Sequence, residues 1–477
     1  MPRALTGKLV NLGTQLTVGK RRIEMSNYLD HIAEFICNCQ FDHLPSDVIK
    51  RTCEVTADTL AAIAAGAQEE EVKVLSERIL ANNDQGISTI FGSGERTEAS
   101  KAALINGTAG TFLELDEGNQ FGRGHPGIHV IPAALAIAEE KSLSGRDFIT
   151  ALVLGYEIGT RIGIACKLRM SMHPHGTWGT VGAAVAVGKL SGYDVSTMKQ
   201  IINISSSLGL ATSRRTMLEG GTVRNVYAGV SGYMGIMAHD LVRSGFIGEA
   251  DGLQTVYGSV VSESFDTKVM TEELGNRFEI GRNYFKIHAC CRYNHATLDA
   301  LDEIMSRRPQ QKIMPDEIDK VEVKTYSLAA QLSDPNPQNM LAGKFSIPFA
   351  VATSIVHGST GIHSFTPEAI QNPVARELAQ KVSVVEDPEL TAMMPAHRPS
   401  KMKVVLKDGS VLEAETLMNK GDAEDPYSSD DLRIKYYELT DQVWSRNIAE
   451  AVYQDAMNLP ELNTITQMTG HIQSAGS

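Results

Sequence analysis

The sequence predicts a mainly α-helical protein that consists of a large all-helical domain and a smaller α+β domain. Apolar segments rich in alanine and glycine follow one another through the first 283 residues, whereas strand-like alternation is confined to a later region. The length of 477 residues also exceeds what one core usually supports, so two domains are expected. We therefore expect the all-helical domain to comprise residues 25–283 and 419–477, and the α+β domain to comprise residues 284–418.

The helical segments of the larger domain can be assigned in order. The first is expected to start near Ser26, and the second is "LPSDVIKRTCEVTADTLAAIAAG", which begins with proline and serine and ends with glycine. Four more follow: "SKAALINGTAGTFLEL", "IPAALAIAEE", "GRDFITALVLGYEIGTRIGIAC" and "GTVGAAVAVGKLSGYD". Small residues dominate their apolar faces, so we expect these helices to approach one another closely.

The smaller domain carries the strand signals. The stretch "DKVEVKTYSL" alternates like a half-buried strand, and "SKMKVVLKDGSVLEAETL" reads as two strands joined at Asp408–Gly409. Between them, "KFSIPFAVATSIVHG" and "PEAIQNPVARELAQKV" have a helical pattern. The capped amphipathic segment "SSDDLRIKYYELTDQVW" then predicts a return to the first domain.

Composition restricts the class of protein. Hydrophobic residues make up 42% and charged residues 21% of the chain, as in soluble globular proteins. The net charge of −13 argues against a nucleic-acid partner, and no apolar stretch approaches the roughly 20 residues needed to cross a bilayer. The six cysteines lack C-x-x-C pairs, which favours reduced thiols and a cytoplasmic location.

Residues 1–24 form a distinct N-terminal extension. They carry five basic residues and no acid before Glu24. This pattern is typical of an organelle transit peptide, which would make the protein mitochondrial. The alternatives are a disordered extension, or a start upstream of the true one at Met25.

A loop dense in charged residues and glycine lies in "ELDEGNQFGRGHPGIHVIPA" and contains Asp116, Glu117 and His125. It matches G-x-G-x-x-G formally, but a helical segment precedes it and a proline lies inside it, so we reject a dinucleotide site. His125 stands before a proline at the start of a helix, where a histidine can meet an anion beside free backbone amides. His129 falls inside that helix and is expected to be an ordinary capping or surface histidine.

Three further loops carry titratable or cationic groups. The stretch "MSMHPHGTWGT" contains His173, His175 and Thr177, and a single His-x-His pair without a third ligand is weak evidence for metal, so no metal site is expected. "EGGTVRNVYAG" places Arg224 at the start of a helix, and "FKIHACCRYNHA" places Lys286 at the domain boundary. The alternative for Lys286 is a snorkelling surface lysine. Together, the four loops predict one cleft for a small anionic substrate.

In this order, the motifs "ELDE…GHPGIHVIPA", "MHPHGTWGTVGAAVAVGKLSGY", "GGTVRNVYAGVSGYMG" and "KIHACCRYNHATLDAL" resemble the MmgE/PrpD family. Its members include 2-methylcitrate dehydratase, cis-aconitate decarboxylase and iminodisuccinate epimerase. The resemblance covers about residues 27–460. It implies an all-helical domain, an α+β lid domain, a homodimer, and catalysis without metal or organic cofactor on substrates with two or three carboxylates.

The resemblance also implies site residues. His125 and His173 match two active-site histidines, Lys286 matches the lysine that enters the lid domain, and Asp116 falls in the acidic loop. This chain departs from the family at three other positions. Arg224 stands where the decarboxylase pattern has a lysine. Cys291 stands where some relatives have a histidine, and Phe349 aligns with a tyrosine of the animal decarboxylase pattern.

Substrates of this kind share one step, the removal of a proton from carbon next to a carboxylate. Arg224 and Lys286 are the candidates for binding carboxylates, and His125 and His173 are the candidates for base and acid. His175, Thr177 and Cys291 complete the predicted substrate site.

The predicted activity is that of a hydro-lyase such as 2-methylcitrate dehydratase, because dehydration is the commonest activity among the named relatives. Decarboxylation of the cis-aconitate type and epimerisation of the iminodisuccinate type use the same residues and are the alternatives. An inactive helical binding protein, and a metal-dependent hydrolase that uses His173 and His175, are the alternatives outside this chemistry.

Overall fold

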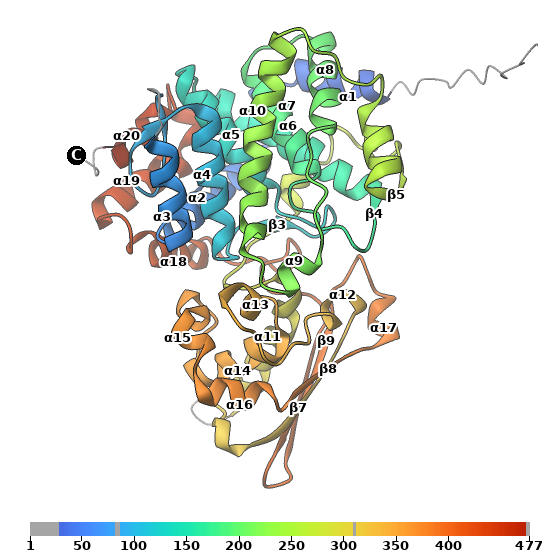
Figure 1. The fold of residues 1–477 in the computed structure, drawn as a ribbon, viewed down its shortest axis with the longest axis vertical. Coiled ribbons are helices and arrows are strands. Elements are labelled where there is room, and N and C mark those ends of the chain that lie inside the picture. The colour runs from blue at the N-terminus through green and yellow to red at the C-terminus, as the bar shows by residue number, and fades with distance from the viewer. Residues whose placement is uncertain (1–27, 82–85, 309–311, 474–477) are drawn as a thin grey trace, which may run out of the picture.

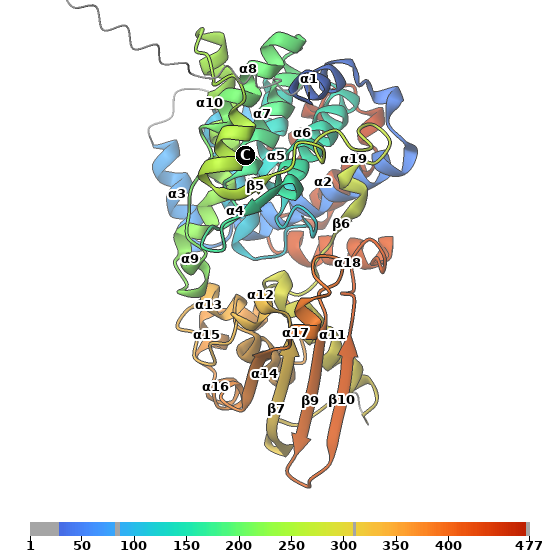
Figure 2. The same cartoon turned by 90° about the vertical axis from the view of Figure 1, so that its right-hand side faces the viewer.

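Two bodies, one of packed helices and one built on a sheet, make up the computed structural model, which describes residues 28–81, 86–308 and 312–473 (Figures 1 and 2). The mainly α fold with a smaller α+β part is confirmed. The predicted domain limits near residues 283 and 418 stay a prediction. The N-terminal extension of residues 1–24 and the helix start at Ser26 lie outside the described residues.

Thirteen of the described α-helices belong to the larger body. They are α1 (Tyr28–Asn38), α2 (Ser46–Gly66), α3 (Glu70–Leu80), α4 (Ala99–Phe112), α5 (Pro126–Glu140), α6 (Gly145–Ala165), α7 (Trp178–Leu190), α8 (Val195–Ser206), α9 (Arg215–Leu218), α10 (Tyr227–Arg243), α18 (Ser429–Thr440), α19 (Arg446–Met457) and α20 (Thr466–Gln473). The last three follow the smaller body in sequence, and α18 and α19 pack on α2. After the smaller body, the chain thus returns to pack against the larger one.

Small residues let the central helices touch backbone to backbone. A Cβ atom on Gly155 of α6 would lie 2.5 Å from the carbonyl oxygen of Gly182 on α7. A Cβ atom on Gly229 of α10 would lie 2.2 Å from the carbonyl oxygen of Leu104 on α4. Alanine at either position would push the pair apart, so the composition of these helices sets their spacing.

Helix α6 corrects one expectation from composition. At 21 residues with a mean hydropathy of 1.4, it is long and apolar enough to cross a bilayer by those measures. Yet 94% of its apolar window is buried among the other helices, which is the position of a core helix.

The smaller body contains a four-stranded sheet in the order β10-β9-β7-β8. Its strands are β7 (Ile318–Thr325), β8 (Val382–Glu386), β9 (Ser400–Leu406) and β10 (Val411–Thr416). Strands β9 and β10 form the predicted hairpin, and Gly409 supplies the left-handed conformation of the turn with φ 87°. Strand β8 pairs parallel with β7 and was not predicted, because its residues follow a helical segment without a turn signal.

The helices of the smaller body are α11 (Arg292–Ser306), α12 (Ser327–Ala330), α13 (Met340–Lys344), α14 (Ile347–His357), α15 (Pro367–Ile370), α16 (Pro373–Ala379) and α17 (Pro388–Thr391). The side chains of β9 alternate between buried and half-buried, and α11 and α14 contact the sheet. The sheet thus buries one face against helices, as an α+β domain requires.

The larger body is not wholly helical, which corrects the prediction. It contains the short pairs β1 (Ser88–Thr89) with β2 (Arg96–Thr97), β3 (Gly118–Asn119) with β6 (Asn283–Tyr284), and β4 (Cys166–Leu168) with β5 (Ser262–Phe265). The β3–β6 pair matters for the site, because it ties the acidic loop to the segment that enters the smaller body.

Candidate active site

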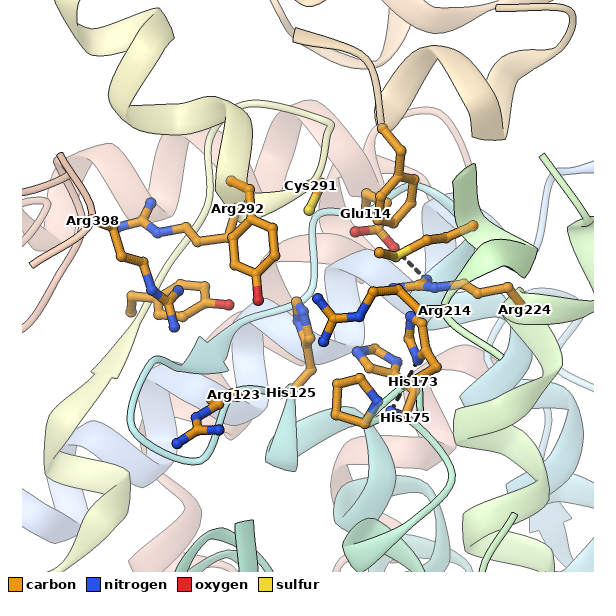
Figure 3. A pocket seen from close by; sticks show the side chains of 16 residues that line it. Glu114, Arg123, His125, His173, His175, Arg214, Arg224, Cys291, Arg292 and Arg398 are labelled. Atoms are coloured by element: carbon orange, nitrogen blue, oxygen red, sulfur yellow. Dashed lines mark hydrogen bonds and ion pairs between the residues drawn. The ribbon is translucent and has the colours of Figure 1, made fainter. Parts of the chain in front are cut away.

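A cavity with about 50 Å³ of space for water-sized molecules lies where the two bodies meet (Figure 3). Basic and aromatic side chains from both bodies line it. The lining residues are Glu114, Arg123, Gly124, His125, His173, Pro174, His175, Arg214, Met217, Arg224, Tyr284, Cys291, Arg292, Tyr293, Phe345 and Arg398. Of the four loops singled out in the sequence, each contributes at least one residue to this cavity.

Five arginines surround the cavity, and their charges are only partly neutralised by protein. Arg224 forms a buried ion pair with Glu114, and Arg292 places Nη2 2.5 Å from Oδ1 of Asp422. In the described part of the chain, no carboxylate lies within 4.0 Å of the other three, which are Arg123, Arg214 and Arg398. Arg398 is buried and the other two are half-buried. Cations partly removed from water without a counter-charge are costly, so the cavity favours an anionic ligand.

His125 is the N-cap residue of α5, and the acidic loop of Asp116 and Glu117 contacts its ring through Nδ1. Its Nδ1 lies 2.8 Å from the carbonyl oxygen of Glu117 and 3.1 Å from Oδ2 of Asp116. Both partners can only accept, so Nδ1 carries a proton, and in the tautomer with a single ring proton Nε2 keeps a free electron pair. Burial raises the pKa of Asp116, but the neighbouring His125 and Lys286 outweigh it and hold that pKa well below its usual range.

Lys286 lies behind His125 and the acidic loop, and it does not line the cavity. Its Nζ is 3.4 Å from Oδ1 of Asp116 and 3.7 Å from Oε2 of Glu114, and the residue is fully buried. The snorkelling alternative is therefore wrong. Glu114 has a left-handed backbone (φ 57°) and carries ion pairs to both Lys286 and Arg224, so it connects the wall to the cavity.

His173 is a buried residue of the loop before α7, and it also lines the cavity. Its Nδ1 accepts the backbone N–H of His175 at 3.1 Å, so the neutral ring carries its proton on Nε2. Burial, followed by the charge of Arg224, lowers the pKa of His173 well below its usual range. The same two causes lower the pKa of His175, whose Nδ1 has no hydrogen-bond partner among the described residues.

His129 is neither a capping nor a surface histidine, which corrects the prediction. It is buried, with Nδ1 2.7 Å from the carbonyl oxygen of His125 and Nε2 accepting the N–H of Gly176 at 3.2 Å. Sequence position inside a helix could not reveal this, because the contact partner comes from a loop after α6.

The remaining predicted residues differ in their access to the cavity. Cys291 caps α11 and lines the cavity, and burial raises the pKa of its thiol to about 11. Thr177 is the N-cap residue of α7, but its hydroxyl donates to the carbonyl of Pro174 at 2.5 Å and does not line the cavity. Phe349 packs against Phe365 away from it.

Sequence reasoning missed several lining residues. Arg292 stacks over the ring of Tyr284 at 4.5 Å, and Arg398 donates to the carbonyl of Gln120 at 2.8 Å. Arg292 lies next to Cys291 within the motif "FKIHACCRYNHA", so that motif could have indicated it. Arg214 and Arg398 stand in stretches without any local signal.

Among residues 28–81, 86–308 and 312–473, no group of three or more histidine, cysteine or acidic side chains is arranged to hold a metal ion. All six cysteines are free thiols.

Comparison with known proteins covers both bodies. The model of the MmgE/PrpD N-terminal domain matches residues 30–268, and that of the MmgE/PrpD C-terminal domain matches residues 288–459. The cis-aconitate decarboxylase-like protein oryM of Aspergillus oryzae is 22% identical over 93% of this chain and 96% of its own length. Cis-aconitate decarboxylase of Aspergillus terreus is 22% identical over 93% and 95%, and that of Mus musculus is 21% identical over 93% of each chain.

Proposed function

Since the chain belongs to the MmgE/PrpD family, whose matched relatives are lyases, we propose that it is a cofactor-independent hydro-lyase for a small di- or tricarboxylate such as 2-methylcitrate. The observation that carries the proposal is the set of three cavity arginines without a carboxylate partner, beside histidines whose hydrogen bonds define their proton positions.

The arginines support a substrate with several carboxylates. A guanidinium can bind a carboxylate through two parallel hydrogen bonds, so Arg214 and Arg398, which both line the cavity, are suited to hold substrate carboxylates. When a proton leaves the carbon next to a carboxylate, negative charge spreads onto that carboxylate. A preorganised arginine stabilises this charge more in the transition state than in the substrate.

The hydrogen bonds of the two histidines support different roles. His125 has its proton on Nδ1, so Nε2 is the nitrogen that can accept a proton from carbon. His173 has its proton on Nε2, so it donates to the substrate. In dehydration, His125 takes the proton from carbon and the carbon–oxygen bond breaks. His173 donates a hydrogen bond to the leaving oxygen, which departs as water with the proton that His125 took up.

In this proposal Lys286 does not touch the substrate and acts through its ion pairs. It pairs with Asp116 behind the residues that line the cavity, and with Glu114, which lines it, so the Asp116 carboxylate stays ionised beside His125. His175 and Cys291 border the bound substrate, and Thr177 shapes the turn that carries His173 and His175.

Decarboxylation of cis-aconitate is the second candidate, because the relatives named above are cis-aconitate decarboxylases. In that reaction carbon dioxide leaves and a histidine protonates the carbanion that remains. The arginine at position 224, paired to Glu114, favours the first candidate, because the decarboxylase pattern has a lysine there.

Proton NMR of the chelator-treated protein in heavy water tests the proposal. The panel contains 2-methylcitrate, citrate, cis-aconitate and iminodisuccinate, and His125→Asn serves as the matched inactive control. We expect alkene formation from a hydroxylated substrate. Loss of carbon dioxide from cis-aconitate would support the second candidate instead, and deuterium exchange with inversion would support an epimerase. If the folded protein converts none of the four compounds, the hydro-lyase proposal is overturned and a non-enzymatic binding protein is favoured.

A further inference from the structure

His129 lies one helical turn after His125 on α5 and contacts the loop that carries His173 and His175. It does not line the cavity, and its ring centroid is 5.0 Å from that of His175. The His129 ring therefore contacts His175 on the side away from the cavity and does not reach the substrate.

Both ring nitrogens of His129 are used inside the protein. Nδ1 faces the carbonyl oxygen of His125 at 2.7 Å and must carry the proton, whereas Nε2 accepts the N–H of Gly176 at 3.2 Å. Burial lowers the pKa of His129 to about 4, so the ring is neutral around pH 7. A neutral ring with one donor and one acceptor matches these two partners and leaves no nitrogen for catalysis.

The packing leaves the ring little freedom. A Cβ atom on Gly179 would lie 2.3 Å from Cδ2 of His129, so the start of α7 closes over the imidazole. The indole of Trp178 lies beside it with ring centroids 5.9 Å apart. The ring thus behaves as a rigid spacer between α5 and the loop before α7.

We propose that His129 is a positioning residue that fixes the loop of His173 and His175 relative to His125. This inference rests on the proposed proton chemistry of those two histidines. One hydrogen bond of His129 ends on the backbone of His125, and the other ends next to His175, so one side chain links the two loops.

Other contacts hold the same loop from outside. The N–H of Leu210 donates to the carbonyl of Gly176 at 2.6 Å, and the N–H of His173 donates to the carbonyl of Thr212 at 2.9 Å. Loss of the His129 link should therefore shift the loop and leave it folded. Displacements of about 1 Å can cost on the order of 100-fold in rate.

Three substitutions distinguish the contributions of the two His129 hydrogen bonds, to the carbonyl of His125 and to the N–H of Gly176. His129→Gln can place an amide oxygen near the Nε2 position and accept from Gly176. His129→Asn can reach only toward the carbonyl of His125, and His129→Leu can make neither bond. Exposed His31 provides the control His31→Gln.

We expect kcat to fall about 10-fold or more for His129→Leu and His129→Asn, with KM changed by less than about 3-fold because the arginines are untouched. His129→Gln should recover most of the loss. The pH profile should keep its shape in all variants, since a neutral positioning residue does not titrate between pH 5 and 8. The proposal would be overturned if a limb of the pH profile were lost or shifted, or if kcat fell equally in His129→Gln and His129→Leu.

Hydrogen exchange of peptides that span residues 171–181 gives a readout independent of substrate. Exchange at the Gly176 amide should accelerate in His129→Leu and His129→Asn and stay slow in His129→Gln and His31→Gln. Unchanged exchange in every variant would refute the link even if the enzyme is active. If exchange changes as expected and no substrate reacts, the link stands and the proposed function fails.

Discussion

Oδ2 of Asp116 lies 3.1 Å from Nδ1 of His125, while Oδ1 of the same carboxylate lies 3.4 Å from Nζ of Lys286. One buried carboxylate therefore joins a histidine that faces the cavity to a lysine that does not. This relationship places the charge that supports proton transfer behind the wall, where substrate carboxylates cannot displace it.

Substitution of this pair should produce graded losses. His125→Asn is expected to lower kcat by roughly 10²- to 10⁴-fold, because it removes the proposed base. Asp116→Asn should cost less, because the carbonyl of Glu117 still holds Nδ1 of His125. Steady-state kinetics, with circular dichroism to verify folding, measures both. A larger loss in Asp116→Asn with normal folding would contradict the assignment of His125 as the base.

His173 should act as a neutral donor. His173→Gln keeps an N–H near the position of Nε2 and is expected to retain at least about 10-fold more activity than His173→Ala. Because the pKa of His173 is far below its usual range, its protonation should add no limb to the kcat/KM profile between pH 5 and 8. Full activity in His173→Ala would remove His173 from the mechanism.

The unpaired arginines should control substrate affinity. Arg214→Met and Arg398→Met are each expected to raise KM by about 10-fold or more, and the loss should shrink as ionic strength rises and screens the remaining cations. The control is Arg433→Met on the exposed face of α18, where Arg433 pairs with Asp430. An unchanged KM in both cavity variants would argue against a polycarboxylate substrate.

Glu117 should make stability depend on pH. Burial raises the pKa of Glu117 from the ordinary 4.5 to about 8, while its hydrogen bonds to Gly127 and Tyr156 oppose the shift. Between these values the unfolded chain has lost the proton and the folded chain keeps it. The contribution of Glu117 to the free energy of unfolding is therefore largest below pH 4.5 and falls as pH rises to about 8, by up to about 1.4 kcal/mol per pH unit.

Glu117→Gln tests this linkage, because the amide keeps an acceptor for the N–H of Gly127 and cannot ionise. Thermal unfolding between pH 5 and 8 should show a shallower decline in the variant than in the wild type. Burial also raises the pKa of Glu157, to about 7, so part of the decline should persist. Identical slopes in the two proteins would show that Glu117 is already ionised in the fold.

Local patterns in the sequence determined much of this protein. Helical periodicity and small residues indicated the packed helices, and the Asp408–Gly409 turn indicated the β9–β10 hairpin, because such signals depend only on neighbours in the chain. The motifs around His125 and His173 indicated the family for the same reason. Strand β8 (VSVVE) was missed despite its valines, because this short run directly follows a helical segment without a turn signal.

Long-range packing alone decided how the site works. Arg214 and Arg398 reach one cavity only because the smaller body closes over the larger one, and no local pattern records that approach. Packing also placed Lys286 behind the wall and fixed the proton positions of His125 and His173. The sequence determined which titratable groups the site could use, and the tertiary structure decided their partners, because burial and hydrogen bonding set the charge and proton position of each group.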